Sequence, residues 1–227
     1  MFFLRLIVGI GFNLALFAIP LFLPAGTLHW WRGWVIVALV LIGTVGAVVG
    51  LVSGHRALLE ERLKPPVQKG QPLADKILLL SLLTTFLGLL VFTSLDANRL
   101  HLMRRPGTLA SSLGLVLCVA GWCCAYLGLR ENAFAVSVVR HQQERNQVVV
   151  DTGPYSIVRH PLYAGGLLLI VGIPLWLESY AGSLAAVAVI TTLVLRIVFE
   201  ERFLRRELSG YDAYAERVRY RLVPFLW

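Results

Sequence analysis

One stretch of the chain combines ionisable side chains with the start of an apolar run. Residues 153–166 read GPYSIVRHPLYAGG. His160 precedes Pro161; a residue before proline is biased away from helix, whereas proline suits the first helical position. Arg159 and His160 therefore stand at a predicted helix start, where free N–H groups and the helix dipole favour an anion. Headgroup anchoring by Arg159 and capping by His160 would explain the same pattern.

A second polar group begins where the last apolar run ends, with EERFLRRELSGYDAYAERVRYRLVP over residues 200–224. Arg196 and Glu200 are four residues apart and can pair along one helix face. A helix emerging into water explains such a charge run. However, Glu200 and Glu201 come directly off an apolar run, on the side where His160 is expected. An apolar stripe continues beyond them, which predicts a tail lying on the membrane or on the core.

The composition indicates that these groups belong to a membrane protein. Of 227 residues, 57% are hydrophobic and 15% are charged, with a mean hydropathy of +0.73. A soluble domain has about 45–50% apolar and roughly 25% charged residues. The net charge of +8 is therefore interpreted as an orientation signal. Nucleic-acid binding is not expected, because no soluble domain presents the charge.

Six segments are apolar over about the length that a bilayer-spanning helix needs. They are residues 4–24, 34–52, 77–95, 108–129, 161–177 and 181–199. The sequence therefore predicts an all-α integral membrane bundle of about six transmembrane helices. The last two should form a tight hairpin, followed by a cytoplasmic amphipathic helical tail. We interpret the first segment as a retained span, since it lacks a small-x-small cleavage site after a short core.

Basic residues are distributed unevenly between the two sides of this predicted bundle. With six spans, the side that holds both termini carries seventeen of the 21 Lys and Arg residues, Lys69 among them. The positive-inside rule then places both termini in the cytoplasm. The protein would lie in the cell inner membrane of a bacterium or in the endoplasmic reticulum membrane of a eukaryote.

The three cysteines do not predict a metal site. Cys118, Cys123 and Cys124 lie inside one apolar run and lack zinc-site spacing. We interpret them as small packing residues. No metal is expected elsewhere, since the chain has no HExxH motif.

The two polar groups together resemble the isoprenylcysteine carboxyl methyltransferase family, whose wider relatives include phospholipid N-methyltransferases. The resemblance covers roughly residues 130–227; the earlier part matches only in being membrane helices. Matching positions are Gly153, Pro154, Tyr155, Arg159, His160, Pro161, Tyr163, Gly165, Glu200, Glu201, Gly210, Tyr211, Tyr214, Arg219, Arg221 and Pro224. The chain departs from the family pattern in placing Tyr directly after Gly210, and either Arg219 or Arg221 can fill the family's arginine position.

The resemblance implies that S-adenosylmethionine binds between the last two spans and the tail. The implied cofactor-binding residues are Tyr155, Arg159, His160, Pro161, Tyr163, Gly165, Glu200, Glu201, Tyr211 and Tyr214. Cationic and helix-start groups suit the cofactor's carboxylate, the glutamates suit its hydroxyl and amino groups, and the tyrosines suit its adenine ring. Gly165 would let either the ligand or a neighbouring helix approach the backbone.

Methyl transfer is an in-line displacement, for which alignment in a dry pocket supplies much of the acceleration. Neither a nucleophilic residue nor a metal is therefore expected. A carboxylate acceptor needs only orientation, for which Arg196 and Arg219 are candidates. An amine or thiol acceptor also loses a proton, which Glu200 or Glu201 can accept.

The predicted function is that of an S-adenosylmethionine-dependent membrane methyltransferase (EC 2.1.1 type) acting on a lipidic or small hydrophobic acceptor. Isoprenylcysteine carboxylate O-methylation is the family default; phospholipid N-methylation and thiol S-methylation stay open. An NADPH-dependent sterol-type reductase is the alternative from another class, although the short chain and the Glu–Glu pair disfavour it. The chain is expected to form a single domain, with 1–129 as membrane scaffold and acceptor side and 130–227 as the cofactor-binding region.

Overall fold

The chain folds into helices, with a long irregular connection between residues 131 and 161. The computed structural model describes residues 1–68, 70–140 and 142–227; Lys69, counted above for orientation, lies outside the described residues. Helix makes up 72% of the chain, and no strand occurs in the described ranges. The helices are α1 (Phe2–Ala25), α2 (Trp31–Val52), α3 (Arg56–Arg62), α4 (Leu73–Leu95), α5 (Thr108–Glu131), α6 (Pro161–Trp176), α7 (Tyr180–Glu207) and α8 (Tyr211–Arg217). The expected all-α class is confirmed.

Five of these helices are long and apolar enough to cross a membrane, namely α1, α2, α4 with its extension to Leu100, α5 and α7. The sixth apolar helix, α6, has 16 residues. At 1.5 Å per residue it is about 24 Å long, less than the roughly 30 Å of a bilayer's hydrocarbon core. The observed bounds follow the six expected segments closely. The main difference is α7, which continues beyond the expected end at 199 and carries the two glutamates as helical residues.

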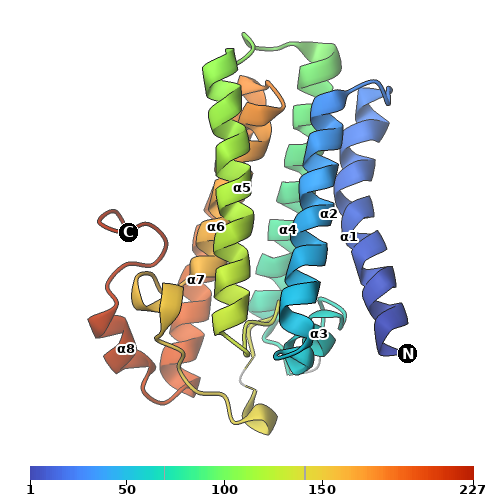
Figure 1. The fold of residues 1–227 in the computed structure, drawn as a ribbon. Coiled ribbons are helices and arrows are strands. Elements are labelled where there is room, and N and C mark those ends of the chain that lie inside the picture. Colours follow the sequence, from blue (N-terminus) through green and yellow to red (C-terminus); the bar gives the residue numbers. More distant parts are fainter. Residues whose placement is uncertain (69, 141) are drawn as a thin grey trace.

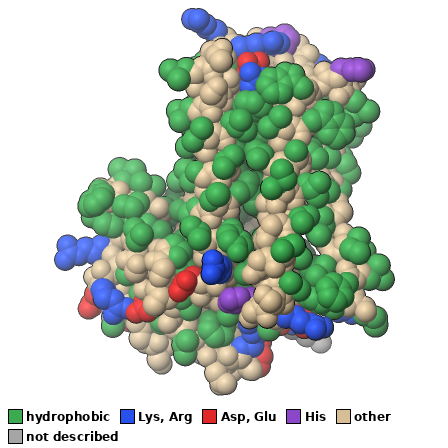
Figure 2. Space-filling model, in the orientation of Figure 1, with side chains coloured by type: hydrophobic (Ala, Val, Ile, Leu, Met, Phe, Trp, Pro, Cys, Tyr) green, Lys and Arg blue, Asp and Glu red, His purple; other side chains and the backbone are tan. Residues whose placement is uncertain are grey.

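The long helices lie side by side, while α3, α8 and the segment between α5 and α6 gather at one end (Figure 1). Hydrophobic side chains cover the middle of the visible face and charged side chains gather at its two ends (Figure 2). Helices satisfy their own backbone hydrogen bonds, which is why they can present such an apolar band to lipid. The arrangement is that of an integral membrane bundle.

Helices α5 and α6 pack through glycines that allow their backbones to meet. A Cβ atom added at Gly165 would lie 2.6 Å from the carbonyl oxygen of Gly121 and 2.9 Å from the amide nitrogen of Ala125. One added at Gly172 would lie 2.7 Å from the carbonyl oxygen of Gly114. Small residues at such positions are the usual means of close helix approach in membranes. Of the two roles considered for Gly165, the structure shows close contact with a neighbouring helix.

The short connection between α6 and α7 closes the expected tight hairpin. Ser179 caps α7, because its Oγ atom accepts a hydrogen bond from the amide of Gly182 at 2.7 Å. The same hydroxyl donates to the buried carboxylate of Asp96 at 2.6 Å. This cap ties the hairpin to the end of α4.

Replacing Gly165 by alanine should loosen the α5–α6 contact. The added methyl group must displace backbone atoms, and such overpacking costs about 1–3 kcal/mol. Gly165→Ala should therefore lower the apparent melting temperature in detergent by several degrees, at roughly 2–4 °C per kcal/mol. Gly166→Ala is the matched control, since a Cβ at Gly166 meets nothing within 4 Å. Equal melting temperatures for the two variants would contradict the packing argument.

Candidate functional site

The residues just before α6 are held by the end of the chain. Gly153–Ser156 forms a short 3₁₀ turn that begins with Gly153 at φ 54°, and His160 occupies the N-cap position of α6. The amide of Arg159 donates to the carbonyl of Tyr220 at 2.9 Å, and the amide of His160 donates to that of Arg221 at 3.0 Å. The tail therefore lies directly against the Arg–His pair.

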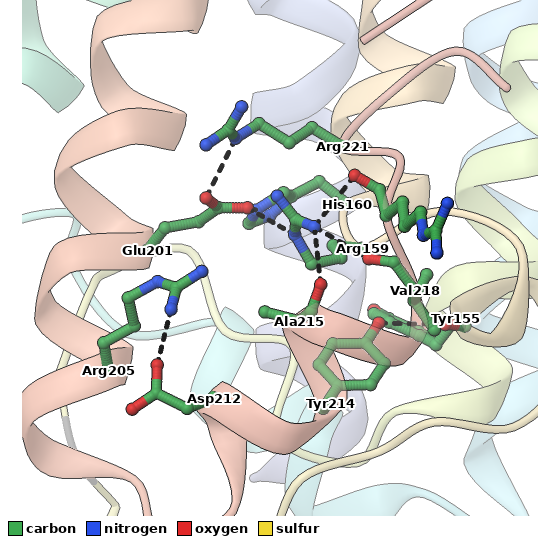
Figure 3. Close-up of polar contacts among 11 residues, drawn as sticks. Tyr155, Arg159, His160, Glu201, Arg205, Asp212, Tyr214, Ala215, Val218 and Arg221 are labelled. Carbon is green, nitrogen blue, oxygen red and sulfur yellow. Dashed lines mark hydrogen bonds and ion pairs between the residues drawn. The ribbon is translucent and has the colours of Figure 1, made fainter. Parts of the chain in front are cut away.

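A buried carboxylate, that of Glu201 at the end of α7, joins these segments (Figure 3). Its Oε1 atom lies 2.6 Å from Nε of Arg159 and 3.2 Å from Nε2 of His160. Its Oε2 atom accepts a hydrogen bond from Nε of Arg221 at 2.9 Å. Glu201 is only 3% exposed, so these three partners replace the water it has lost.

Arg159 uses the rest of its guanidinium to hold the end of α8. Its Nη1 atom donates to the carbonyl oxygens of Val218 at 2.7 Å, Arg219 at 3.0 Å and Ala215 at 3.3 Å. These carbonyls belong to the last turn of α8 and the residues that follow, where backbone acceptors have no helical partner. In this structure Arg159 binds the tail rather than facing outward toward headgroups.

The neighbouring Glu200 is placed differently from Glu201. It is partly buried and accepts a hydrogen bond from the hydroxyl of Tyr163 at 2.5 Å. The Tyr163 ring stacks on His160, with centroids 5.5 Å apart. Successive helical residues differ by about 100° around the axis, so one glutamate reaches the ion cluster while the other faces a cavity.

That cavity has a volume of about 130 Å³. Seven of the ten predicted cofactor residues line it, brought together from the start of α6, the end of α7 and the tail: Tyr155, Arg159, His160, Tyr163, Glu200, Tyr211 and Tyr214. Its opposite wall comes from residues within 132–150. Residues remote in sequence thus enclose one space.

Two buried polar atoms on residues of the cavity wall have no hydrogen-bond partner among the described residues. They are the hydroxyl oxygen of Tyr211 and the Nε atom of Arg140. Burial, with added effects of Glu201 and Glu200, raises the pKa of Tyr211, so its hydroxyl stays protonated and can donate. By contrast, the hydroxyl of Tyr214 donates to the carbonyl of Tyr155 at 2.9 Å. Unpaired buried polar atoms are uncommon and point to a missing partner.

Not every predicted site residue faces the cavity. Pro161 opens α6 and Gly165 contacts α5. Arg196, a candidate for orienting the acceptor, instead pairs with the buried Asp75, its Nε atom 3.3 Å from Oδ1. Arg219 is exposed, whereas Arg221 reaches Glu201. Of the two arginines considered for the family position, Arg221 is therefore the one in the ion cluster.

The wall formed by residues within 132–150 belongs to the region predicted to bind the cofactor, but no site residue was predicted among them. Asp75 fixes this wall, because its Oδ2 atom accepts from the amide of Val139 at 2.9 Å, and Arg196 donates to the carbonyl of Ser137 at 2.6 Å. A lone aspartate at the start of an apolar helix was the available signal. The position of Asp75 in the sequence does not predict a hydrogen-bond partner within residues 132–150.

No group of three or more His, Cys, Asp and Glu residues within the described ranges is arranged to hold a metal ion. The expectation of a metal-free reaction stays a prediction.

Neutralising Glu201 should release the tail. Glu201→Gln leaves the buried guanidinium of Arg159 without its counter-charge, and breaking a buried pair costs about 3–5 kcal/mol. We expect faster tryptic cleavage within 217–221 and a lower melting temperature. Arg205→Gln is the control, since the Arg205–Asp212 pair is 43% and 63% exposed and such pairs contribute about 0–1 kcal/mol. Equal cleavage of both variants would refute the role of Glu201.

Comparison with known proteins supports a family relation for the part of the chain that contributes α6 and α7 to this site, but not for the tail. The chain is 34% identical over 109 residues to the cobalt-zinc-cadmium resistance protein CzcN of Cupriavidus metallidurans. It is 31% identical over 110 residues to the nickel-cobalt-cadmium resistance protein NccN of Alcaligenes xylosoxydans xylosoxydans. Each match covers 46% of this chain and 44% of the relative, so it spans less than half of the relative's length. Residues 109–209, from α5 to the end of α7, match the phospholipid methyltransferase family, which is related to the isoprenylcysteine carboxyl methyltransferases, and the predicted resemblance is confirmed.

Proposed function

We propose that this protein is an integral-membrane methyltransferase that uses S-adenosylmethionine to methylate a lipidic or small hydrophobic acceptor. The observation that carries the proposal is the cavity lined by seven sequence-predicted cofactor residues from three separate segments. The family match over residues 109–209 supports methyl transfer as the reaction class.

The chemistry of the cavity wall fits the cofactor. Glu200 offers a carboxylate to its hydroxyl or amino groups, while the free Tyr211 hydroxyl and Arg140 Nε offer donors to its carboxylate. Arg140 already pairs with Glu61 and Glu144 through its Nη atoms, so only its Nε is available, whereas the Nε of Arg159 is bound to Glu201. The rings of Tyr155, Tyr211 and Tyr214 supply an apolar, stackable surface.

The volume of the cavity is small for the proposed cofactor. Small-molecule sites usually measure about 300–1,000 Å³, whereas this cavity measures about 130 Å³. We therefore propose that one wall moves to admit a nucleoside-sized ligand. The candidate is the wall from residues 132–140 and 142–150, because it contains no α-helix and its contacts with the membrane helices include those of Val139 with Asp75 and of Ser137 with Arg196.

In this mechanism the residues of the chain align the reactants, exclude water and, for some acceptors, accept a proton. When bound, the cofactor supplies an electrophilic methyl group. The cavity wall binds and aligns both reactants and excludes water, which supplies the main acceleration. For an amine or thiol acceptor, Glu200 is the better proton acceptor, because Glu201 is stabilised as a carboxylate by Arg159, His160 and Arg221. For a carboxylate acceptor, Arg219 could orient the substrate only if the exposed arginine side chain moved toward the cavity. Arg196 could do so only after breaking its ion pair with Asp75.

The remaining expectations form part of the same proposal. Residues 130–227 would hold the cofactor, and residues 1–129 would form the scaffold and the acceptor side. Both termini would lie in the cytoplasm, as the distribution of Lys and Arg predicts. The acceptor would enter laterally from the bilayer.

Tyr211→Phe tests the cofactor site without disturbing the fold. The variant loses a hydroxyl that has no partner among the described residues, so its melting temperature should be unchanged. One lost hydrogen bond of about 0.5–1.5 kcal/mol predicts roughly 2–12-fold weaker S-adenosylmethionine binding in calorimetric titration. Tyr214→Phe is the matched control, because it loses the bond to Tyr155 and should instead lower the melting temperature. Failure of the unmutated protein to bind the cofactor would refute the proposal.

Transfer of a labelled methyl group should identify the acceptor class. Purified protein in nanodiscs is incubated with labelled S-adenosylmethionine and a total lipid extract, a prenylcysteine or a small hydrophobic thiol. We expect label in one class and its loss on replacing Glu200 by Gln if that acceptor is an amine or a thiol. NADPH oxidation with a sterol, in the absence of methyl transfer, would instead assign the reductase chemistry.

A further inference from the structure

The last described segment, which we call the 221–227 loop, folds into a closed turn beside the ion cluster. The carbonyl of Trp227 accepts hydrogen bonds from the amides of Arg221, Leu222 and Val223 at 2.9, 3.1 and 3.3 Å. The guanidinium of Arg221 lies over the Trp227 ring, 4.9 Å from its centroid. The base of the loop is thus joined to the residue that pairs with Glu201.

The loop lies at the depth of the apolar helices. It turns back past α8 and lies beside α6 and α7, at a level above the end of α5 (Figure 1). Leu222 is buried in a cluster with Leu193 and Ile197 of α7, and Val223 and Trp227 pack against the same cluster. A bilayer that surrounds α5 and α7 therefore also reaches this loop.

The tip of the loop presents two large apolar side chains outward. Phe225 is 89% exposed and Leu226 is 80% exposed. Hydrophobic side chains gather around this end of the chain, with basic side chains below them (Figure 2). Phe225 also adopts a positive φ of 66°, which is unfavourable for an aromatic residue. The Phe225 ring contacts that of Tyr220, with centroids 5.3 Å apart, yet most of the Phe225 side chain stays uncovered.

The backbone of the loop is suited to an environment without water. The amides of Arg221, Leu222, Val223, Leu226 and Trp227 all donate within the loop, and Pro224 has no N–H group. Irregular backbone at membrane depth is tolerated only where its polar groups are satisfied internally or by protein. The loop meets this requirement for each of its N–H groups except that of Phe225, which makes no backbone hydrogen bond among the described residues.

We propose that the 221–227 loop inserts Phe225 and Leu226 into the leaflet nearest α8 and thereby holds the wall of the cavity in place. The exposed Arg219 sits two residues before the loop, where it can meet lipid phosphates. Insertion fixes Arg221 on Glu201 and the tail carbonyls on the amides of Arg159 and His160. The inference concerns the loop and does not depend on which ligand the cavity binds.

Photocrosslinking in phospholipid nanodiscs tests the insertion. Benzoylphenylalanine placed at Phe225 should give an adduct with the mass of a phospholipid. The same probe at Ala213, exposed on α8 below the loop, should give at least about tenfold less lipid adduct, because apolar tips partition into the bilayer. Equal lipid adducts at the two positions would overturn the proposal. So would adducts at 225 to a second protein chain only, which would assign the tip to an interface between copies.

Hydrogen exchange tests the link between the membrane and the cavity. The experiment compares the unmutated protein in nanodiscs with the double variant Phe225→Ser, Leu226→Ser. In the double variant, the backbone amides of Arg159 and His160 should exchange hydrogen about tenfold faster. Val67→Ser is the control, since Val67 is a half-exposed apolar residue in the segment after α3. Unchanged exchange rates of these two amides in the double variant would refute the proposed coupling between loop insertion and the cavity wall. Neither readout uses the cofactor, so both are independent of the methyltransferase proposal.

Discussion

The structure around the cavity depends on the neutralisation of one buried carboxylate. An ion taken out of water costs several kcal/mol unless it is paired and hydrogen-bonded. Glu201 meets this requirement through Arg159, His160 and Arg221, which come from the start of α6 and from the tail. Its partners cannot separate without leaving charges unpaired. The end of α7, the start of α6 and the chain after α8 are consequently held as one unit.

The need to pair a buried charge also explains the position of the opposite wall of the cavity. Asp75 is fully buried at the start of α4 and is satisfied by Arg196, by the side chain of Gln71 and by the amide of Val139. This pairing brings the irregular 132–150 segment over the membrane helices. The wall is held by these polar contacts and by the buried side chains of Val138 and Val139.

Two adjacent glutamates serve different purposes because a helix turns them apart. Glu201 pairs with Arg159, His160 and Arg221, whereas Glu200 accepts from Tyr163 and faces the cavity. Arg159 and Arg140 differ in the same way. Arg159 binds Glu201 and tail carbonyls through Nε and Nη1, whereas Arg140 pairs with Glu61 and Glu144 but has an Nε atom that meets no partner within the described chain. The polar atoms that remain free at the cavity, rather than the strongest ion pairs, indicate where a ligand would be held.

Much of the fold is predictable from the amino-acid sequence. Long apolar runs must become helices in lipid, so the six helical segments and their class follow from hydropathy alone. The spacing around His160 and Pro161 likewise predicts where α6 begins. The two polar groups indicate a shared site because both come directly off apolar runs on the same side.

Only the tertiary structure decided how those residues are used. The contact of Gly165 with Gly121 depends on which helix packs beside α6. The choice of Arg221 over Arg219, and the pairing of Arg196 with Asp75, depend on contacts between residues far apart in the chain. Hydropathy and motif spacing describe one segment at a time. Which buried charge finds which partner is a property of the folded chain, because it is set by distances between segments.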